Sequence, residues 1–466
     1  MIKKASYVIV GGGLPSLLFA YLLTKKDPSR RIVVIESSDK VGGLFKSTQN
    51  NFGDTFDQGM HIYYETEILE LDQAFLEILP SEDWLYLEGN RKDIAGIYYN
   101  GKLQLDTPYP DLRDSAESKK LAFIRSLFQP IENKNLQEYR NASALLIDHF
   151  GEEITNEIIE PILQKLYNLN ANQLDPLAFR LTAINRVALF SAQIVGDLMK
   201  SDYLRSRIAY PDQLGMRQER ESSSRGIYPK NFGFGKVISK ITDILLENNV
   251  LFLFKTRIKE LVIEENKIKY VICDSEEETK IEIEAGVIWS ADVFSLLKTL
   301  KEKVESKLKV EQKRYINFTL NCYPNMGELY YFYNFDVSSE IFRVTNFTAY
   351  CPNATKDGRY PICVEYWSKD VLTEDQMKAK TVNDLIAMKV IENSGQILYA
   401  EVSNLPILFP TPSVEAVDSI NEARSVLDKK SIENLVLTGS LSSKNVFFLH
   451  EVLKNGYESL RMKDWL

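Results

Sequence analysis

A run of glycines near the N-terminus has the spacing that suits a phosphate group. Gly11-Gly12-Gly13-Leu14-Pro15-Ser16 follows the apolar segment 7–10 and opens a second apolar segment. Between a strand and a helix, such glycines let the backbone turn tightly at Gly11 and approach a pyrophosphate at Gly13. Ser16 holds the third position, where a small residue lets the helix and strand pack closely. The free N–H groups and the positive dipole end of the helix would face the diphosphate.

A carboxylate follows where a dinucleotide site needs one. Glu36 ends the apolar segment 31–35, 25 residues after Gly11, and Ser37 comes next. A carboxylate in this position accepts hydrogen bonds from an adenosine ribose and repels a 2′-phosphate, so the pattern disfavours NADP. A glycine turn with a surface glutamate is the alternative interpretation.

A second glycine pair, Gly42-Gly43, stands shortly after Glu36 and is followed by Leu44. A plain NAD-binding fold does not require another close backbone approach here, so the pair favours an extended cofactor, FAD, over NAD. A plain β-turn is the alternative. The predicted cofactor-binding residues of this region are Gly11, Gly13, Leu14, Pro15, Ser16, Glu36, Ser37, Gly42, Gly43 and Leu44.

One β-α-β unit must position these residues. Tyr7–Val10 and 31–35 read as short buried strands, and Pro15 suits the first turn of the helix between them. The longest apolar run, 14–23, has about half the length of a membrane-spanning helix. No small-residue cleavage site follows it, so the sequence predicts neither a membrane span nor a signal peptide.

The composition excludes several function classes. The chain has 466 residues, a net charge of -9, four cysteines and three histidines. An acidic excess lacks the electrostatic footprint of a nucleic-acid or anionic-membrane binder. So few histidines, and cysteines without a C-x-x-C pair, argue against a metal site and against a disulfide framework. We therefore expect no metal, no nucleic-acid partner and a cytoplasmic location.

The rest of the chain divides by pattern. Residues 115–218 are mostly helical, and the polar run 216–225 reads as an exposed loop. Strands dominate 250–289, with a hairpin tip at 274–278, and alternating aromatic and polar residues predict antiparallel strands over 318–367. The charge-rich segment 298–314 is typical of a solvated helix face.

These motifs lead into Phe56-Asp57-Gln58-Gly59-Met60-His61. Together they resemble the FAD-binding start of the FAD-dependent amine oxidase, protoporphyrinogen oxidase and UDP-galactopyranose mutase superfamily. Residues 59–64 are most similar to the mutases, whose equivalent loop runs beside the flavin ring. The second histidine of that loop is replaced by Tyr64.

The resemblance extends to the middle and the end of the chain. The similar segments are 161–174 in the helical part, 228–233, 257–258, 289–292, 342–345, 365–366, and the closing motif 435–456. It implies an α/β fold: a Rossmann-like FAD-binding domain from discontinuous segments, with a mixed-sheet substrate domain and a helical insertion. The expected divisions are 1–75, 219–300 and 406–466 for the FAD-binding domain, 76–114 and 301–405 for the substrate domain, and 115–218 for the insertion.

The resemblance also implies further site residues. The added cofactor contacts are Gly59, Met60, His61, Ile258, Gly439, Ser440 and Val446. His61 and His450 fall in the two segments that bracket the flavin, where either would orient substrate or hydrogen-bond the reduced flavin, or would simply be packed. Arg343 is a candidate catalytic, anion-binding or flavin-contacting residue, with a surface arginine as the alternative. Tyrosines such as Tyr333 either line an aromatic pocket or belong to the core.

The function expected from these features is an FAD-dependent oxidoreductase that dehydrogenates a small organic substrate by hydride transfer. The alternatives are a mutase-like, non-redox isomerase of a nucleotide-sugar and a non-catalytic flavin-binding protein. Mutases carry basic, aromatic and acidic residues where this chain has Ser440, Val446 and Phe448, which favours the oxidoreductase. The sequence leaves a homo-oligomer open.

Overall fold

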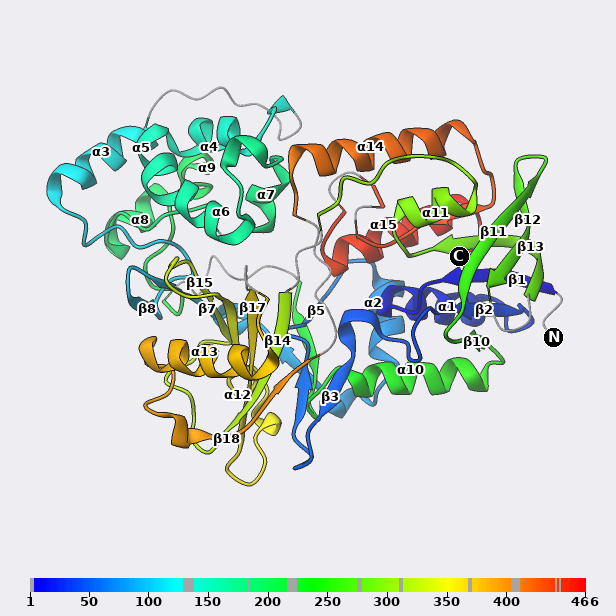
Figure 1. Ribbon diagram of the computed structural model, residues 1–466, viewed down its shortest axis with the longest axis horizontal. Coiled ribbons are helices and arrows are strands. Elements are labelled where there is room, and N and C mark those ends of the chain that lie inside the picture. Colours follow the sequence, from blue (N-terminus) through cyan, green and yellow to red (C-terminus); the bar gives the residue numbers. More distant parts are fainter. Residues whose placement is uncertain are drawn as a thin grey trace.

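A computed structural model describes the chain except residues 1–3, 129–137, 183, 216–223, 275–278, 310–312, 368–370, 404–410, 441 and 444–445. Two seven-stranded sheets and a group of helices surround its centre. In Figure 1 the sheet that contains the N-terminal strand lies on the right, the second sheet lies at lower left, and the cyan helices lie at upper left. Most of the predicted polar loop 216–225 falls outside the described residues.

The first sheet has the order β10-β2-β1-β13-β12-β11, with β19 also paired to β13. Its parallel strands are β1 (Lys4–Val10), β2 (Ile32–Ile35), β10 (Leu251–Leu253), β13 (Thr279–Trp289) and β19 (Leu435–Leu437). The antiparallel strands are β11 (Arg257–Glu264) and β12 (Lys267–Asp274). Segments far apart in the sequence therefore share one sheet, and the predicted discontinuous α/β fold is confirmed.

Strand β13 holds two different neighbours on one edge. Its residues 279–282 pair with β12, and its residues 287–289 pair with β19. The first pairing forms the predicted hairpin, whose tip at 275–278 lies outside the described residues. The second brings the end of the chain into the sheet that β1 begins.

Helices cover both faces of this sheet, so its central strands are apolar on both sides. Tyr7 and Ile9 of β1 belong to the core on the face of α1 (Leu14–Lys26), α10 (Gly235–Glu247) and α15 (Leu449–Met462). Val8 and Val10 belong to the core on the opposite face, under α11 (Val293–Thr299) and α14 (Val414–Lys429). The predicted β-α-β unit is confirmed as β1, α1 and β2.

The second sheet is mixed, with the order β18-β14-β17-β16-β15-β7-β8. Its strands are β7 (Ala95–Tyr99), β8 (Lys102–Gln104), β14 (Lys313–Leu320), β15 (Tyr331–Asn334), β16 (Ile341–Asn346), β17 (Tyr360–Trp367) and β18 (Ile397–Val402). The predicted antiparallel pairing over 318–367 is confirmed for β14–β17. Helices α12 (Phe347–Tyr350) and α13 (Glu374–Ala387) accompany this sheet.

Smaller sheets lie between the two large ones. They are formed by β3 (Ser47–Gln49) with β4 (Thr55–Asp57), and by β5 (Tyr63–Tyr64), β9 (Gly226–Pro229) and β6 (Trp84–Leu87). The short helix α2 (Leu69–Leu76) follows β5 and contacts α1.

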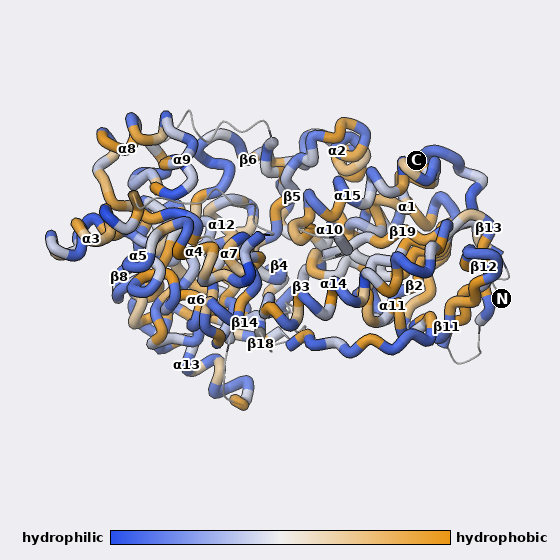
Figure 2. The backbone as a smooth tube through the Cα atoms, turned by 90° about the horizontal axis from the view of Figure 1, so that it is seen from above, coloured by the Kyte–Doolittle hydropathy of each residue, from blue (hydrophilic) through white to orange (hydrophobic). Residues whose placement is uncertain are grey.

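The predicted helical segment forms a cluster with its own core. Its helices are α3 (Glu117–Leu127), α4 (Ala142–Phe150), α5 (Glu152–Ile154), a π-helical turn (Thr155–Ile159), α6 (Glu160–Tyr167), α7 (Leu177–Leu181), α8 (Ala192–Leu198) and α9 (Asp202–Arg205). Apolar and polar stretches alternate along these helices in Figure 2, as expected where one face packs inward. Among the described helices, none combines the length and apolar character that crossing a bilayer demands. The six-part domain division remains a prediction.

The prediction of a helix over residues 298–314 is wrong for most of this segment. Helix α11 ends at Thr299, residues 302–309 have no regular structure, and β14 begins at Lys313. The Lys307 N–H points to Ser419 Oγ on α14 at 3.4 Å, and Val304 packs against the core beneath α11 and α14. The segment therefore runs along α14 as a connection between the two sheets.

Gly286 on β13 offers a test of how the chain end is held. A Cβ there would lie 2.1 Å from the indole of Trp465, whose ring packs edge-on against Tyr7 at 5.1 Å. We expect Gly286→Ala to lower the free energy of unfolding by about 2 kcal/mol through overpacking. Urea titration measures the change. Gly196→Ala is the control, because Gly196 lies exposed in α8 with open space around it, and it should be neutral or slightly stabilising.

Candidate functional site

A cavity of about 460 Å³ lies where the two large sheets and the helical cluster meet. Its wall comes from the glycine-rich loop 13–15, the loops 42–45 and 60–61, the second sheet, and the closing segment 439–452. Tyr167 and Leu181 complete it from the helical cluster. The volume is in the range of small-molecule and cofactor sites.

The three glycines of the first run are explained by different features of the structure. Gly11 has φ +95°, a left-handed conformation that a side chain disfavours. A Cβ on Gly12 would lie 2.6 Å from Val41 Cγ1. A Cβ on Gly13 would meet only Pro15 Cδ, at 3.8 Å, so the space beside Gly13 is open to the cavity. Gly13 also precedes the first turn of α1, whose N–H groups suit an anion.

The predicted ribose-binding carboxylate stands beside this loop. Glu36 Oε2 accepts the Gly12 N–H at 2.8 Å, and Oε1 accepts the Ser38 N–H at 2.8 Å. The Glu36 backbone is joined to β10 by its N–H to Leu253 O at 2.9 Å. Oε1 also accepts the Ser37 hydroxyl at 3.4 Å, so Oε2, with one donor, is the oxygen that keeps acceptor capacity for a ligand hydroxyl.

The second glycine pair packs directly on the first. Gly42 has φ +116° and donates its N–H to Gly12 O at 2.7 Å, and a Cβ on Gly43 would lie 3.5 Å from Gly13 Cα. Gly42 and Leu44 also line the cavity. The pair therefore has a loop-packing role in addition to the position that the sequence predicts.

A row of four side chains crosses the second sheet beneath the cavity. The register aligns Tyr315 of β14 with Glu365 of β17, Glu365 with Arg343 of β16, and Arg343 with Tyr333 of β15. All four line the cavity. Glu365 and Tyr315 were missed by the sequence analysis, although the alternation of side chains along paired strands could have placed them beside Arg343 once the register was known.

Arg343 is the centre of this row. Its guanidinium forms an ion pair with Glu365, and its Cζ lies 5.6 Å from the ring centres of both Tyr331 and Tyr333. Burial opposes the charge of Arg343, but the Glu365 carboxylate outweighs that effect and raises the arginine pKa above its ordinary value. The surface-arginine alternative is therefore excluded, and the pair brings no net charge to the cavity.

His61 lies in the cavity wall opposite the sheet. Its ring is 4.9 Å from that of Phe45, and its Nε2 is buried with no hydrogen-bond partner among the described residues. Burial and then the positive charge of Arg343 lower the His61 pKa to about 4, so the ring is neutral at pH 7. A buried polar atom without a partner is uncommon and points to a missing ligand group.

Asp57 anchors the loop that carries His61, and the sequence analysis did not single it out. Its buried carboxylate accepts Ser47 Oγ–H at 2.5 Å, Tyr228 O–H at 2.5 Å and the Phe234 N–H at 3.1 Å. Burial raises the Asp57 pKa to about 6, and the three donors oppose this rise. Two residues later, Gly59 packs so closely on the second sheet that a Cβ would lie 2.7 Å from Glu365 Oε1.

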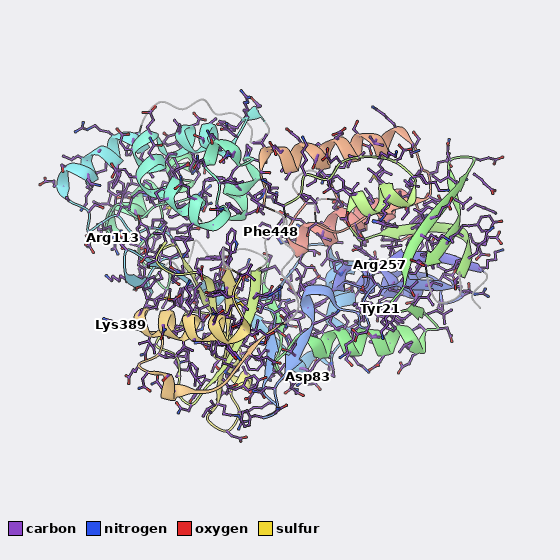
Figure 3. All side chains as sticks on the ribbon, in the orientation of Figure 1. Tyr21, Asp83, Arg113, Arg257, Lys389 and Phe448 are labelled. Carbon is purple, nitrogen blue, oxygen red and sulfur yellow. The ribbon has the colours of Figure 1, made fainter. Side chains whose placement is uncertain are left out.

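The closing segment covers the cavity from the other side. Gly439, at φ +100°, and Ser440 line it, and Ser440 Oγ donates to Phe447 O at 3.1 Å. Glu451 of α15 accepts the N–H groups of Phe447 and Phe448 at 2.9 and 3.0 Å and pairs with Arg180 of α7. In Figure 3 Phe448 lies near the centre of the molecule, where its parts converge.

Several predicted site residues lie outside the cavity wall. His450 is half-buried, with its ring parallel to that of Phe448 at 6.1 Å. Val446 is buried beside the wall, and Ile258 packs against the sheet core in β11. Ser16, fully buried at the start of α1, and the exposed Ser37 are likewise not wall residues. Their contacts with a cofactor remain predictions. His149 is structural, since its Nε2 hydrogen-bonds Asn185 O at 3.0 Å.

The first part of the chain matches a known family. Residues 9–75 match the family described as NAD(P)-binding Rossmann-like domain. The segment that contains the glycine-rich loop is therefore similar to a Rossmann-like domain. No curated protein sequence matches the chain significantly.

Solved structures share the whole fold. A reduced UDP-galactopyranose mutase matches with a TM-score of 0.74 and 13% identity, covering 100% of this chain and 95% of that one. A protein of Exiguobacterium sp. 255-15 named as a protoporphyrinogen oxidase matches with a TM-score of 0.69 and 15% identity, and the match covers 100% of both chains. Wild-type putrescine oxidase bound to putrescine matches with a TM-score of 0.62 and 13% identity, and the match covers 100% of this chain and 99% of that one. The predicted resemblance to these enzymes is confirmed as a common fold.

The raised pKa of Asp57 gives a pH-dependent stability. Because the folded-state pKa is about 6 and an unfolded aspartate titrates near 3.9, the folded chain holds the proton more tightly. The stabilisation is complete below about pH 4 and is lost as the pH rises through 6. Relative to Asp57→Asn, the wild-type free energy of unfolding should fall by about 2 kcal/mol between pH 4 and pH 7.

Urea titrations of both proteins at the two pH values measure this difference. Asp114→Asn, at an exposed position, is the control and should follow the wild type. Identical pH profiles for wild type and Asp57→Asn would show that burial does not shift the titration of Asp57.

Proposed function

We propose that the protein is an FAD-dependent oxidoreductase that dehydrogenates a small organic substrate by hydride transfer to the flavin. The observation that carries this proposal is the single cavity that runs from the open face of Gly13 to His61 and the Arg343–Glu365 pair. One end suits a dinucleotide diphosphate, and the other offers aromatic and titratable groups for a substrate. This continuity supports a cofactor site that adjoins a substrate site.

The residues of the cavity fit FAD. Gly13 leaves the space in which a side chain would collide with a diphosphate, and Glu36 has acceptor capacity for ribose hydroxyls. The buried Nε2 of His61, which has no partner among the described residues, supplies a hydrogen-bonding atom for the ring system or the substrate. Gly13, Gly42 and Gly439 approach the cavity from three separate loops, as an extended cofactor requires.

When bound, FAD supplies the electron chemistry, and the protein supplies position, water exclusion and electrostatics. The first turn of α1 and Gly13 would hold the diphosphate, and Glu36 would orient the ribose. Phe447 and Phe448 shield the cavity from solvent on the side of α15. His61, neutral at pH 7, can accept a proton at one ring nitrogen without first losing one.

The isomerase alternative is less well supported. A nucleotide-sugar diphosphate needs uncompensated cations, and the only cation among the described wall residues is Arg343, which pairs with Glu365. Anaerobic mixing separates the two activities. A dehydrogenase bleaches its oxidised flavin with substrate, whereas the isomerase requires prior reduction and shows no net electron transfer. A protein that takes up no FAD would refute both.

Gly13→Asp tests the cofactor assignment cleanly. A side chain at Gly13 meets no atom of the described protein closer than 3.8 Å, and aspartate is a favoured residue before a helix. We therefore expect thermal stability without FAD to be kept, while the visible flavin absorbance of the purified protein is lost. The carboxylate would occupy and repel the diphosphate position. Normal flavin content would show that the glycine-rich loop does not hold the cofactor.

His61→Ala tests the titratable group of the cavity. Flavin content should remain unchanged, while turnover falls about 100-fold or more if the ring acts in proton transfer. His450→Ala compares the two predicted histidines: because the His450 ring lies outside the cavity wall, we expect turnover to fall less than in His61→Ala. If His61→Ala changes neither turnover nor flavin potential, the histidine serves packing alone.

A further inference from the structure

A second cavity, of about 440 Å³, adjoins the first. Phe179, Arg180 and Thr182 of the helical cluster belong to its wall. Leu181, Tyr333 and Phe448 line both cavities. These three side chains form a shared boundary, which we call the junction. The first cavity is the inner one, beside the glycine-rich loop, and the second is the outer one.

The junction is formed by side chains from three different parts of the fold. Leu181 ends α7, Tyr333 belongs to the row of the second sheet, and Phe448 precedes α15. Phe448 keeps 39% of its surface exposed, although its neighbour Val446 is buried. A large apolar side chain exposed at the meeting of two cavities provides contact area for an apolar ligand.

Every charged group described in the two walls has a counter-charge within the protein. Arg343 pairs with Glu365 in the inner cavity, and Arg180 of the outer cavity pairs with Glu451. His61 is neutral at pH 7. Away from the diphosphate position at Gly13 and the start of α1, a charged ligand would therefore lose its hydration in these cavities without gaining an unpaired partner, and that loss is unfavourable by several kcal/mol.

The remaining wall is largely aromatic and aliphatic. Met60, Tyr167, Phe342 and Phe447 belong to the inner cavity, and Phe179 belongs to the outer one. Of the polar groups in the outer cavity, the Thr182 hydroxyl already donates to Ala178 O at 2.9 Å. Asn185 is a further polar residue of the outer wall. A largely apolar wall without an unpaired charge among its described residues favours an uncharged, mainly apolar occupant.

We propose that the outer cavity is the second half of the substrate site and that the substrate is a long, uncharged, mainly apolar molecule. It reaches from the row Tyr315–Glu365–Arg343–Tyr333 across the junction to Phe179. This inference rests on the proposed function, since the inner cavity is shared with the cofactor. The Arg180–Glu451 pair fixes the outer wall, because Glu451 also holds the backbone of Phe447 and Phe448.

The charge preference is tested with matched probes on the protein as purified, with its flavin content measured separately. Retinol is a long neutral polyene, retinoate has the same skeleton with a carboxylate, and UDP carries the diphosphate of a nucleotide-sugar. Titration followed by protein fluorescence gives each Kd. We expect retinol to bind at least about 10-fold more tightly than retinoate, which corresponds to about 1.4 kcal/mol, and UDP not to bind.

The length preference is tested by narrowing the junction. Leu181→Trp should weaken retinol at least about 10-fold but leave the short neutral probe 2-naphthol, which fits within one cavity, within about twofold. Thr182→Trp, which fills only the outer cavity, should also weaken retinol and leave 2-naphthol unchanged. This variant replaces Leu181→Trp in the test if Leu181→Trp does not fold. Ile194→Trp, half exposed on α8, is the control and should change neither probe.

Three results would overturn the inference. They are retinoate or UDP binding as tightly as retinol, equal effects of the tryptophan variants on long and short probes, and no binding of retinol at all. If the protein contains no flavin and still binds retinol more tightly than retinoate and UDP, the proposed redox function is refuted and the proposed apolar site is supported. A flavin-containing protein that prefers UDP would refute the apolar site and keep the flavin assignment.

Discussion

The buried carboxylate of Asp57 is the constraint on which the site depends. An ionised carboxylate in the core is unfavourable by several kcal/mol unless donors surround it, and Ser47, Tyr228 and Phe234 supply three. These donors belong to β3, β9 and the start of α10. Ser47 precedes Asp57 by 10 residues, whereas Tyr228 and Phe234 follow it by 171 and 177 residues. Since α10 packs against α1, the same carboxylate ties the glycine-rich loop to the loop that carries His61. The two ends of the cavity, at Gly13 and at His61, are thereby held in a fixed relative position.

The site combines titratable groups with overall electrical neutrality. Arg343 and Glu365 face each other across two strands, and tyrosine rings flank the pair on the same sheet. In a low-dielectric cavity such a pair contributes little net stability, but it gives the wall a fixed dipole and rigid hydrogen-bonding geometry. An uncharged molecule can enter beside it without displacing either partner. Neutral His61 on the opposite wall adds a proton acceptor without adding charge.

Local patterns predicted the first part of the fold, because the β-α-β unit is built from neighbours in sequence. Gly11, Gly13 and Glu36 lie close together in sequence within this unit, so the sequence spacing alone predicted that they would lie together in the fold. The row of side chains beneath the cavity could not be predicted in this way. Arg343 contacts Glu365 only because of the register between β16 and β17, and the alternation of polar and apolar residues along a strand did not determine that register here. The segment 298–314 was predicted as a helix because charge patterning ignores the tertiary contact of Val304 and Lys307 with α14. His450, placed at the flavin by resemblance, lies between the wall residues Leu449 and Val452 of α15, but it does not line the cavity, and its ring is parallel to that of Phe448.

The sheet begun by β1 takes its last parallel strand, β19, from residues 435–437, and α15 then seals one of its faces. Trp465 fits over Gly286, a residue with no side chain to exclude it. Strand β1 pairs with β2 and β13, so it gains its second strand neighbour only after residues 279–289 have been synthesised, and β13 gains β19 only after residues 435–437 have been synthesised. The N-terminal unit waits through synthesis with apolar surface exposed, and its pairing with distant segments is inherently slow. Until these segments pair, the exposed apolar surface is open to aggregation, and chaperone binding in that interval affects the yield of folded protein.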